Sequence, residues 1–193
     1  ISDDTFIGAY LEKAKVLERL NRFNEAIDNY NISMAIEGPT AFTYLKIGVC
    51  HEKMHHKDKA IKYFFKSVKE DPAFGKGWMQ IADFYFLRRD DLKALFYVNK
   101  AIDIDDENAN YWLFYSKTNR RLNYLEEAER GFKKTLELGE TSLDTWIQRG
   151  DILIELGEIE AAKYNFVQAI EHHPKSEELE FRLSGLYFKL NDS

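Results

Sequence analysis

The sequence predicts an all-α chain in which similar pairs of helices are stacked one after another. Two kinds of residue recur at intervals of 34 residues, and their positions can be read directly from the chain. The aromatic residues are Tyr10, Tyr44, Trp78, Trp112 and Trp146, and the alanines are Ala26, Ala60, Ala94, Ala128 and Ala162. A period of this size is typical of a repeat architecture, in which neighbouring units bury a continuous core.

The repeats divide the whole chain into five complete units and one partial unit. We place the units at about 7–40, 41–74, 75–108, 109–142, 143–176 and, for the partial unit, 177–193. Each complete unit consists of a first helix, called helix A, a turn, and a second helix, called helix B. The chain therefore contains five helix pairs and one further helix.

Helix A is predicted from apolar residues at helical spacing, as in Trp112, Tyr115 and Leu122. Residues that favour turns follow it in each unit: Asn21, His55-His56, Arg89-Asp90, Asn123 and Gly157. Helix B then carries the periodic alanine, because a small side chain lets two helix backbones approach closely. Pro72 and Pro174 end helix B in their units, since proline disfavours helical geometry in the residue before it.

No linker rich in glycine, serine or charge interrupts the pattern, so we expect one continuous array over residues 1–193. The pair Asp3-Asp4 stands where Asp71-Pro72 and Asp105-Asp106 end their own units. This correspondence suggests another unit upstream, and we expect the chain to be a piece of a longer protein.

The repeated residues resemble the tetratricopeptide repeat family, whose unit reads W-x2-L-G-x2-Y, then A-x3-F, then P. One copy is Trp146-x2-Arg149-Gly150-x2-Leu153, followed by Ala162-x3-Phe166 and Pro174. Another copy runs from Tyr44 through Gly48, Ala60 and Phe64 to Pro72, and the departures include Val98, Asp106 and Glu140. The resemblance implies a right-handed α-α superhelix whose partner lies along the concave side, against places 2, 5, 9, 12 and 13 of helix A.

The composition excludes several classes of function. The formal net charge is −6, which makes the chain a poor ligand for nucleic acid, and no apolar run approaches the roughly 20 residues of a membrane span. The single cysteine, Cys50, allows no intramolecular disulfide and fits a reducing compartment, so we expect a cytoplasmic protein. We predict no cofactor.

Two local patterns suggest metal chemistry, but the repeat argues against both. His51-Glu52-Lys53-Met54-His55 is a literal H-E-x-x-H, the zinc motif of metalloproteases. His51, however, occupies a place that faces inward in other units, while His55 falls in the turn. The other pattern, Asp103, Asp105 and Glu107, lacks both the glycine and the closing glutamate of a calcium loop. We therefore predict neither a metal site nor an enzyme.

The remaining candidate site is the concave surface formed by the A helices. Its fifth place is apolar in every unit, which suits either peptide binding or packing between neighbouring A helices. Asp83, Lys117 and Asp151 alternate in sign at the ninth place, where an ion ladder between units is the alternative to partner binding. The residues predicted to contact a partner are Phe42, Lys76, Met79, Asp83, Phe86, Leu113, Phe114, Lys117, Arg120, Arg121 and Asp151.

The lysine and asparagine clamp with which some family members hold acidic chaperone tails is not reproduced. We expect a non-catalytic module that binds a protein or peptide in its groove; the alternatives are a structural spacer and an array attached to a catalytic domain elsewhere. In the last helix, we expect Leu183, Leu186, Tyr187 and Leu190 to have no partner helix within the chain. This predicts self-association through residues 177–190.

Overall fold

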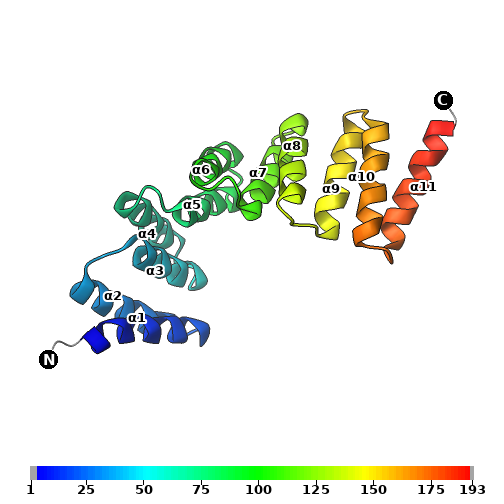
Figure 1. Cartoon of the computed structure of the whole chain (residues 1–193). Coiled ribbons are helices and arrows are strands. Elements are labelled where there is room, and N and C mark those ends of the chain that lie inside the picture. Colours follow the sequence, from blue (N-terminus) through cyan, green and yellow to red (C-terminus); the bar gives the residue numbers. More distant parts are fainter. Residues whose placement is uncertain (1–3, 192–193) are drawn as a thin grey trace. The chain divides into compact units, whose positions relative to one another are not determined.

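The computed structural model describes residues 4–191, with side chains described for residues 8–188. Asp3 and the side chain of Leu190 lie outside this description. Within it the chain forms eleven α-helices and no strand (Figure 1), which confirms the all-α prediction. The helices are α1 (Asp4–Arg19), α2 (Phe23–Glu37), α3 (Ala41–Lys53), α4 (Lys57–Glu70), α5 (Gly75–Leu87), α6 (Asp91–Ile104), α7 (Ala109–Arg121), α8 (Leu125–Glu137), α9 (Leu143–Glu155), α10 (Ile159–His172) and α11 (Glu177–Asn191).

The turns between helices A and B share one backbone device. Asn21, His55, Arg89 and Asn123 have φ between 59° and 63°, and Gly157 has φ 79°. A left-handed residue after a helix turns the chain so that the next N–H reaches back to a free carbonyl of the last helical turn. The N–H of His56, for example, donates to the carbonyl of His51 at 2.8 Å. The residues predicted from sequence as turn formers therefore occupy the turns.

The chain divides into two compact units, Ile1–Arg88 and Arg89–Ser193, here called unit 1 and unit 2. Unit 1 contains α1 to α5. Its core joins the first three helices through Ala14, Leu17, Ala26, Tyr30, Ile47 and Cys50. In the next pair, α3 and α4 approach closely at Gly48, where an added Cβ would lie 2.5 Å from Cε1 of Phe64. The glycine thus makes room for the ring.

Unit 2 contains α6 to α11, of which α9, α10 and α11 lie side by side in Figure 1. Its largest core includes Trp146 and Leu153 of α9, Phe166 of α10, and Leu179 and Leu186 of α11. The expectation that Leu183 and Leu186 lack a partner helix is therefore wrong. The side of α11 that carries Leu183 and Leu186 packs against α10. Helix A of each repeat packs against helix B of the repeat before it in the same way.

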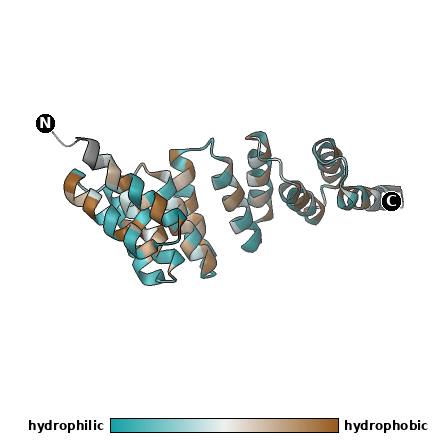
Figure 2. Cartoon of the chain, turned by 90° about the horizontal axis from the view of Figure 1, so that it is seen from below, coloured by the Kyte–Doolittle hydropathy of each residue, from teal (hydrophilic) through white to brown (hydrophobic). Residues whose placement is uncertain are grey.

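The five periodic alanines are all buried, as the repeat predicts. Figure 2 shows hydrophobic and hydrophilic residues on the same helices, as expected for helices with one packed face. Two of the periodic tryptophans also hold the preceding loop in place. The indole N–H of Trp78 donates a hydrogen bond to the carbonyl of Pro72, and that of Trp112 donates one to the carbonyl of Asp106. In the repeat at 143–176, the ring of Trp146 instead stacks on the ring of His172, with 5.6 Å between the ring centroids.

Candidate functional site

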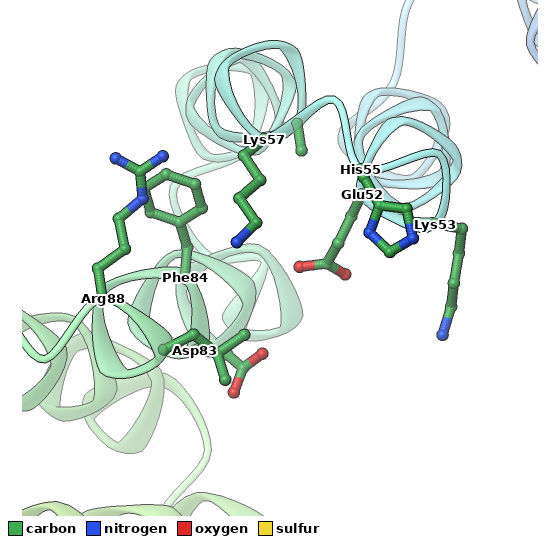
Figure 3. A pocket seen from close by; sticks show the side chains of 9 residues that line it. Glu52, Lys53, His55, Lys57, Asp83, Phe84 and Arg88 are labelled. Atoms are coloured by element: carbon green, nitrogen blue, oxygen red, sulfur yellow. The ribbon is translucent and has the colours of Figure 1, made fainter.

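The candidate site is a pocket of about 340 Å³ in unit 1 (Figure 3). It lies between the end of α3, the start of α4 and the end of α5. The residues that line it are Glu52, Lys53, His55, Lys57, Ala60, Asp83, Phe84, Leu87 and Arg88. We call it the α3–α5 pocket.

The repeat places two carboxylates in this pocket from different helices. Glu52 stands one residue before the end of α3, and Asp83 stands in the following helix A, α5. The left-handed turn at His55 reverses the chain, so that α4 begins beside the pocket and contributes Lys57 and Ala60. The pocket is therefore a consequence of stacking one helix pair on the next helix A.

One wall of the α3–α5 pocket is apolar. Phe84 and Ala60 are buried, whereas Leu87 is mostly exposed at the mouth. The guanidinium of Arg88 lies 4.4 Å from the centroid of the Phe84 ring and 3.6 Å from a carboxylate oxygen of Asp58. These contacts engage Arg88 on the outer side of the ring, and the aliphatic and aromatic surface remains available to the pocket.

Glu52 and Asp83 are the two carboxylates of the α3–α5 pocket, and both are half-buried. Burial, followed by repulsion from Asp83, raises the pKa of Glu52, and burial raises the pKa of Asp83. Among the described residues, neither side chain forms an ion pair or a hydrogen bond. Figure 3 shows Glu52 and Lys57 extending toward the same space, while Lys53 points away. Lys57 forms no ion pair with either carboxylate among the described residues, and the charge of Lys53 offsets only part of the effect of burial on the pKa of Glu52.

The other predicted contacts of unit 1 are spread over its helices. Phe42 is half-buried, with the ammonium groups of Lys15 and Lys46 at 5.6 and 5.8 Å from its ring centroid. These three side chains, with Glu18 and Arg19, line a separate hollow of about 350 Å³. Met79 and Phe86 are half-buried and Lys76 is exposed. Of the predicted residues in unit 1, only Asp83 lines the α3–α5 pocket.

In unit 2, each of the three predicted cations of α7 pairs with a carboxylate of the chain itself. Lys117 lies 3.3 Å from Asp144 and Arg120 lies 3.6 Å from Glu155, so both bridge α7 to α9. Arg121 lies 2.6 Å from Asp91 of α6. The sequence argument compared these cations only with the ninth-place aspartates, whereas other carboxylates neutralise them.

The remaining predicted residues of unit 2 also make contacts within it. Asp151 pairs with Arg182 and so links α9 to α11. Leu113 packs against the core cluster of Ala128, Phe132 and Ile152, which is the packing role left open for the fifth place. Phe114 is half-buried. Unit 2 therefore contains a series of ion pairs along α7, α9 and α11.

The H-E-x-x-H histidines occupy different environments. His51 is buried, with its ring 5.4 Å from that of Tyr63, and burial lowers its pKa. His55 occupies the left-handed turn. Within the described part of the chain, no group of three or more His, Cys, Asp or Glu side chains is arranged to hold a metal ion.

Comparison with known proteins identifies the repeat. Residues 43–74 and 143–172 match the family model described as Tetratricopeptide repeat. Two of its helix pairs, α3–α4 and α9–α10, are thus recognised as tetratricopeptide repeats. The crystal structure of YrrB, described as a TPR protein with an unusual peptide-binding site, superposes with a TM-score of 0.70 at 17% identity and covers 91% of this chain and 90% of that one. At this identity the likeness supports the fold alone.

Two curated human relatives are longer chains. Tetratricopeptide repeat protein 6 is 29% identical over 100 residues, which cover 52% of this chain and 19% of that protein. DnaJ homolog subfamily C member 7 is 23% identical over 180 residues, which cover 87% of this chain and 36% of that protein. The chain thus spans between about a fifth and just over a third of these relatives. Among its described helices, none is long and apolar enough to cross a membrane.

Sequence reasoning did not select the half-buried Glu52 or the exposed Leu87 as contacts for a partner. Glu52 and Leu87 occupy places 12 and 13 of helix A, where the family pattern puts ligand contacts, yet Glu52 was considered only as part of a zinc motif. Phe181 and Phe188 occupy places 5 and 12 of α11 and are 81% and 71% exposed. The rule of places that selected Phe86 also covers Glu52 and Leu87, and it already put Phe181 and Phe188 in the apolar stripe of helix A, although neither was among the predicted contacts.

Proposed function

We propose that the chain is a non-catalytic protein-interaction module, and that the α3–α5 pocket receives one basic side chain of the partner segment. Support for an interaction role comes from the tetratricopeptide repeats and from the place of the pocket on helix A. Support for a basic side chain comes from the pocket itself. The observation that carries the proposal is the pair of half-buried carboxylates, Glu52 and Asp83, neither of which forms an ion pair with another described residue.

A cation between these carboxylates would relieve their mutual repulsion and offset the cost of their burial. Lysine and arginine also have long apolar stems, which can lie along apolar surface while the charged group reaches a polar partner. In the α3–α5 pocket, Phe84 and Leu87 offer that apolar surface. The charged group of one basic side chain can therefore pair with the two carboxylates while its apolar stem packs against the apolar wall.

The basic rim of the pocket adds a restriction on the partner. Lys53 and Lys57 lie at the pocket and have no ion-pair partner among the described residues. A second cation next to the anchor would be repelled by them, while a neighbouring carboxylate would be attracted. Repulsion of this kind contributes to specificity as much as attraction does. The preferred segment is one basic residue flanked by acidic or neutral residues.

The test is a selection from a display library of random peptides on the intact chain. We expect the selected peptides to share lysine or arginine at one position, with other basic residues depleted beside it. The same selection on the double variant Glu52→Gln/Asp83→Asn should lose that preference. The matched control is Asp28→Asn/Glu37→Gln, which removes two exposed acids from α2 in the same unit and should retain it.

Two results would overturn the proposal. A wild-type selection without a preferred basic position would remove the assigned ligand chemistry. A preference that survives in Glu52→Gln/Asp83→Asn would place the ligand elsewhere on the chain. Circular dichroism of each variant checks that its helices are intact.

Within unit 2, we propose that the cations of α7 form a separate contact for an acidic peptide segment. Exposed ion pairs such as Lys117 with Asp144 contribute only about 0–1 kcal/mol. A carboxylate of the partner can therefore replace Asp144 or Glu155 at little cost. Such an exchange should act mainly on the association rate and its salt dependence. The measurement is the association rate of a selected peptide with Lys117→Ala/Arg120→Ala; an unchanged rate at low salt would exclude this contact.

A further inference from the structure

A second hollow adjoins the α3–α5 pocket and is lined mainly by basic side chains. It measures about 430 Å³, and its lining residues are His55, His56, Lys57, Asp58, Lys59 and Arg88. Three of these residues, His55, Lys57 and Arg88, also line the α3–α5 pocket, so the two spaces share one wall (Figure 3). We call the second space the basic hollow.

The basic hollow has more positive charge than its own carboxylate neutralises. Asp58 lies 3.6 Å from Arg88, and both side chains of this ion pair are exposed to solvent. Lys57 and Lys59 form no ion pair with another described residue. Three cations against one carboxylate leave two positive charges among the lining residues. Solvent screens an exposed pair such as Asp58 with Arg88, so an incoming anion can take the place of Asp58.

The local backbone concentrates this charge at one point. His55 has φ 61°, and this left-handed turn reverses the chain so that α4 begins at Lys57, close to the end of α3. Lys57 and Lys59 thus lie in the first turn of α4, where the helix dipole disfavours cations. An anion bound between the two lysines would offset both their mutual repulsion and their unfavourable place on the helix.

Hydrogen-bond donors surround the same space. An imidazole ring has an N–H group whether it is neutral or charged, and neither His55 nor His56 donates from its side chain to another described residue. The ammonium groups of the lysines add further donors. The guanidinium of Arg88 has a planar set of N–H groups that suits the oxygens of a phosphate. The basic hollow therefore offers several donors to one oxygen-rich anion.

We propose that the basic hollow binds a phosphate monoester of the partner segment, so that the chain recognises a phosphorylated residue near the basic side chain that enters the α3–α5 pocket. A phosphate monoester has about 1.5 to 2 negative charges at pH 7 and three acceptor oxygens. It matches the excess charge and the donors of the hollow better than a carboxylate, which has one charge and two oxygens. This inference rests on the proposed function and specifies the neighbour of the basic residue.

The shared wall limits the distance between the two charged groups of the partner. An extended chain advances about 3.3–3.6 Å per residue. Because the two spaces adjoin at His55, Lys57 and Arg88, we expect the phosphorylated residue within about three positions of the basic residue. Lys57 belongs to both spaces and should reduce the repulsion between the phosphate and Glu52.

The first test uses a synthetic peptide with the basic residue found in the display selection. Serine, aspartate and phosphoserine are placed in turn at each neighbouring position, and binding is measured by fluorescence anisotropy. We expect phosphoserine at one position to tighten binding about tenfold relative to serine, and more than aspartate does, because several charge-assisted hydrogen bonds form. No gain at any position, or equal gains from aspartate and phosphoserine, would overturn the proposal.

Two lysines of α4 provide a matched pair of variants. Lys59 lines the basic hollow but not the α3–α5 pocket, whereas Lys69 lines neither of them. Both side chains are exposed, and neither forms an ion pair with a described residue. Lys59→Gln should remove most of the gain from phosphoserine and leave the affinity of the serine peptide nearly unchanged, while Lys69→Gln should retain the gain. Equal gains in the two variants would refute the assignment of the phosphate to this hollow.

A titration with phenyl phosphate tests the hollow without any peptide. In NMR spectra of the backbone amides, we expect shifts confined to residues 55–59 and Arg88, both in the wild type and in Glu52→Gln/Asp83→Asn, and smaller shifts with benzoate at the same concentration. Absent shifts, or shifts spread over exposed lysines throughout the chain, would overturn the phosphate site. Shifts at the basic hollow in a chain whose peptide selection shows no basic position would support the phosphate site and overturn the proposed function alone.

Discussion

Gly150 of α9 should not tolerate even one methyl group. A Cβ built there would lie 2.3 Å from Cζ and 2.4 Å from Cε1 of Phe166. Phe166 is fully buried in the core that joins α9, α10 and α11, so its ring cannot move aside without disturbing Leu179 or Leu186. Gly150→Ala therefore tests whether close approach of helices A and B holds this part of unit 2 together.

The expected magnitude follows from two opposing effects. Replacing glycine by alanine inside a helix stabilises it by about 0.5–1 kcal/mol. Overpacking a filled core costs about 1–3 kcal/mol. Gly185→Ala on α11 gains the first effect alone, because its Cβ meets nothing within 4 Å. The difference in unfolding free energy between the two alanine variants should therefore equal the steric cost, about 1–3 kcal/mol.

The assay is urea unfolding of wild type, Gly150→Ala and Gly185→Ala, followed by circular dichroism and by tryptophan fluorescence. The protein concentration is kept low so that self-association makes no contribution. We expect Gly185→Ala to unfold at higher urea than the wild type, and Gly150→Ala to unfold at lower urea than Gly185→Ala. Equal midpoints for the two variants would refute the packing argument.

Three further predictions concern buried groups. Ala128→Leu should lower the unfolding free energy by about 1–3 kcal/mol in urea titrations, because Ala128 is buried beside Phe132; an unchanged midpoint would mean that this face has spare room. Burial raises the pKa of Asp83, so its protonation stabilises the fold at low pH and that contribution is lost as the pH rises through the folded-state pKa. Asp83→Asn should thus melt at a higher temperature than wild type at neutral pH, with a gain that shrinks toward acidic pH; a gain independent of pH would contradict this assignment. Burial raises the pKa of Cys50 to about 12, so a thiol reagent at mildly alkaline pH should react with it slowly in the native protein and rapidly after unfolding, and fast native reaction would show that the helix opens.

The fold could be predicted from the sequence because each repeated residue answers a local physical requirement. The left-handed turns need a residue such as Asn21 or Gly157, and the helix crossings need a small residue such as Ala94. These requirements act within one unit and recur in the next, so the period reveals them. Leu186 was misassigned because it is buried by α9 and α10 of the preceding repeat, and the sequence argument considered only a helix that would follow α11.

The candidate site was harder to predict because long charged side chains form ion pairs with residues of other helices. Lys117 pairs with Asp144 of the next helix A, and nothing in the period of either residue selects that pair over others. Glu52 and Asp83 are 31 residues apart in the chain but line one pocket, while the local H-E-x-x-H pattern favours a different interpretation of Glu52. The repeat period identifies which residues of helix A belong to the groove. It does not show which of their charged side chains form ion pairs within the chain.

The most direct test of the proposed ligand site is a double-mutant cycle measured by isothermal titration calorimetry. One axis of the cycle changes the basic anchor of a selected peptide to norleucine, and the other changes the chain to Glu52→Gln/Asp83→Asn. Residues in direct contact show an interaction energy of about 0.5–3 kcal/mol in such a cycle. We predict that norleucine weakens binding to the wild type but has little effect on binding to the double variant. Equal losses of affinity on both proteins would contradict the central claim that these two carboxylates hold the partner's basic side chain.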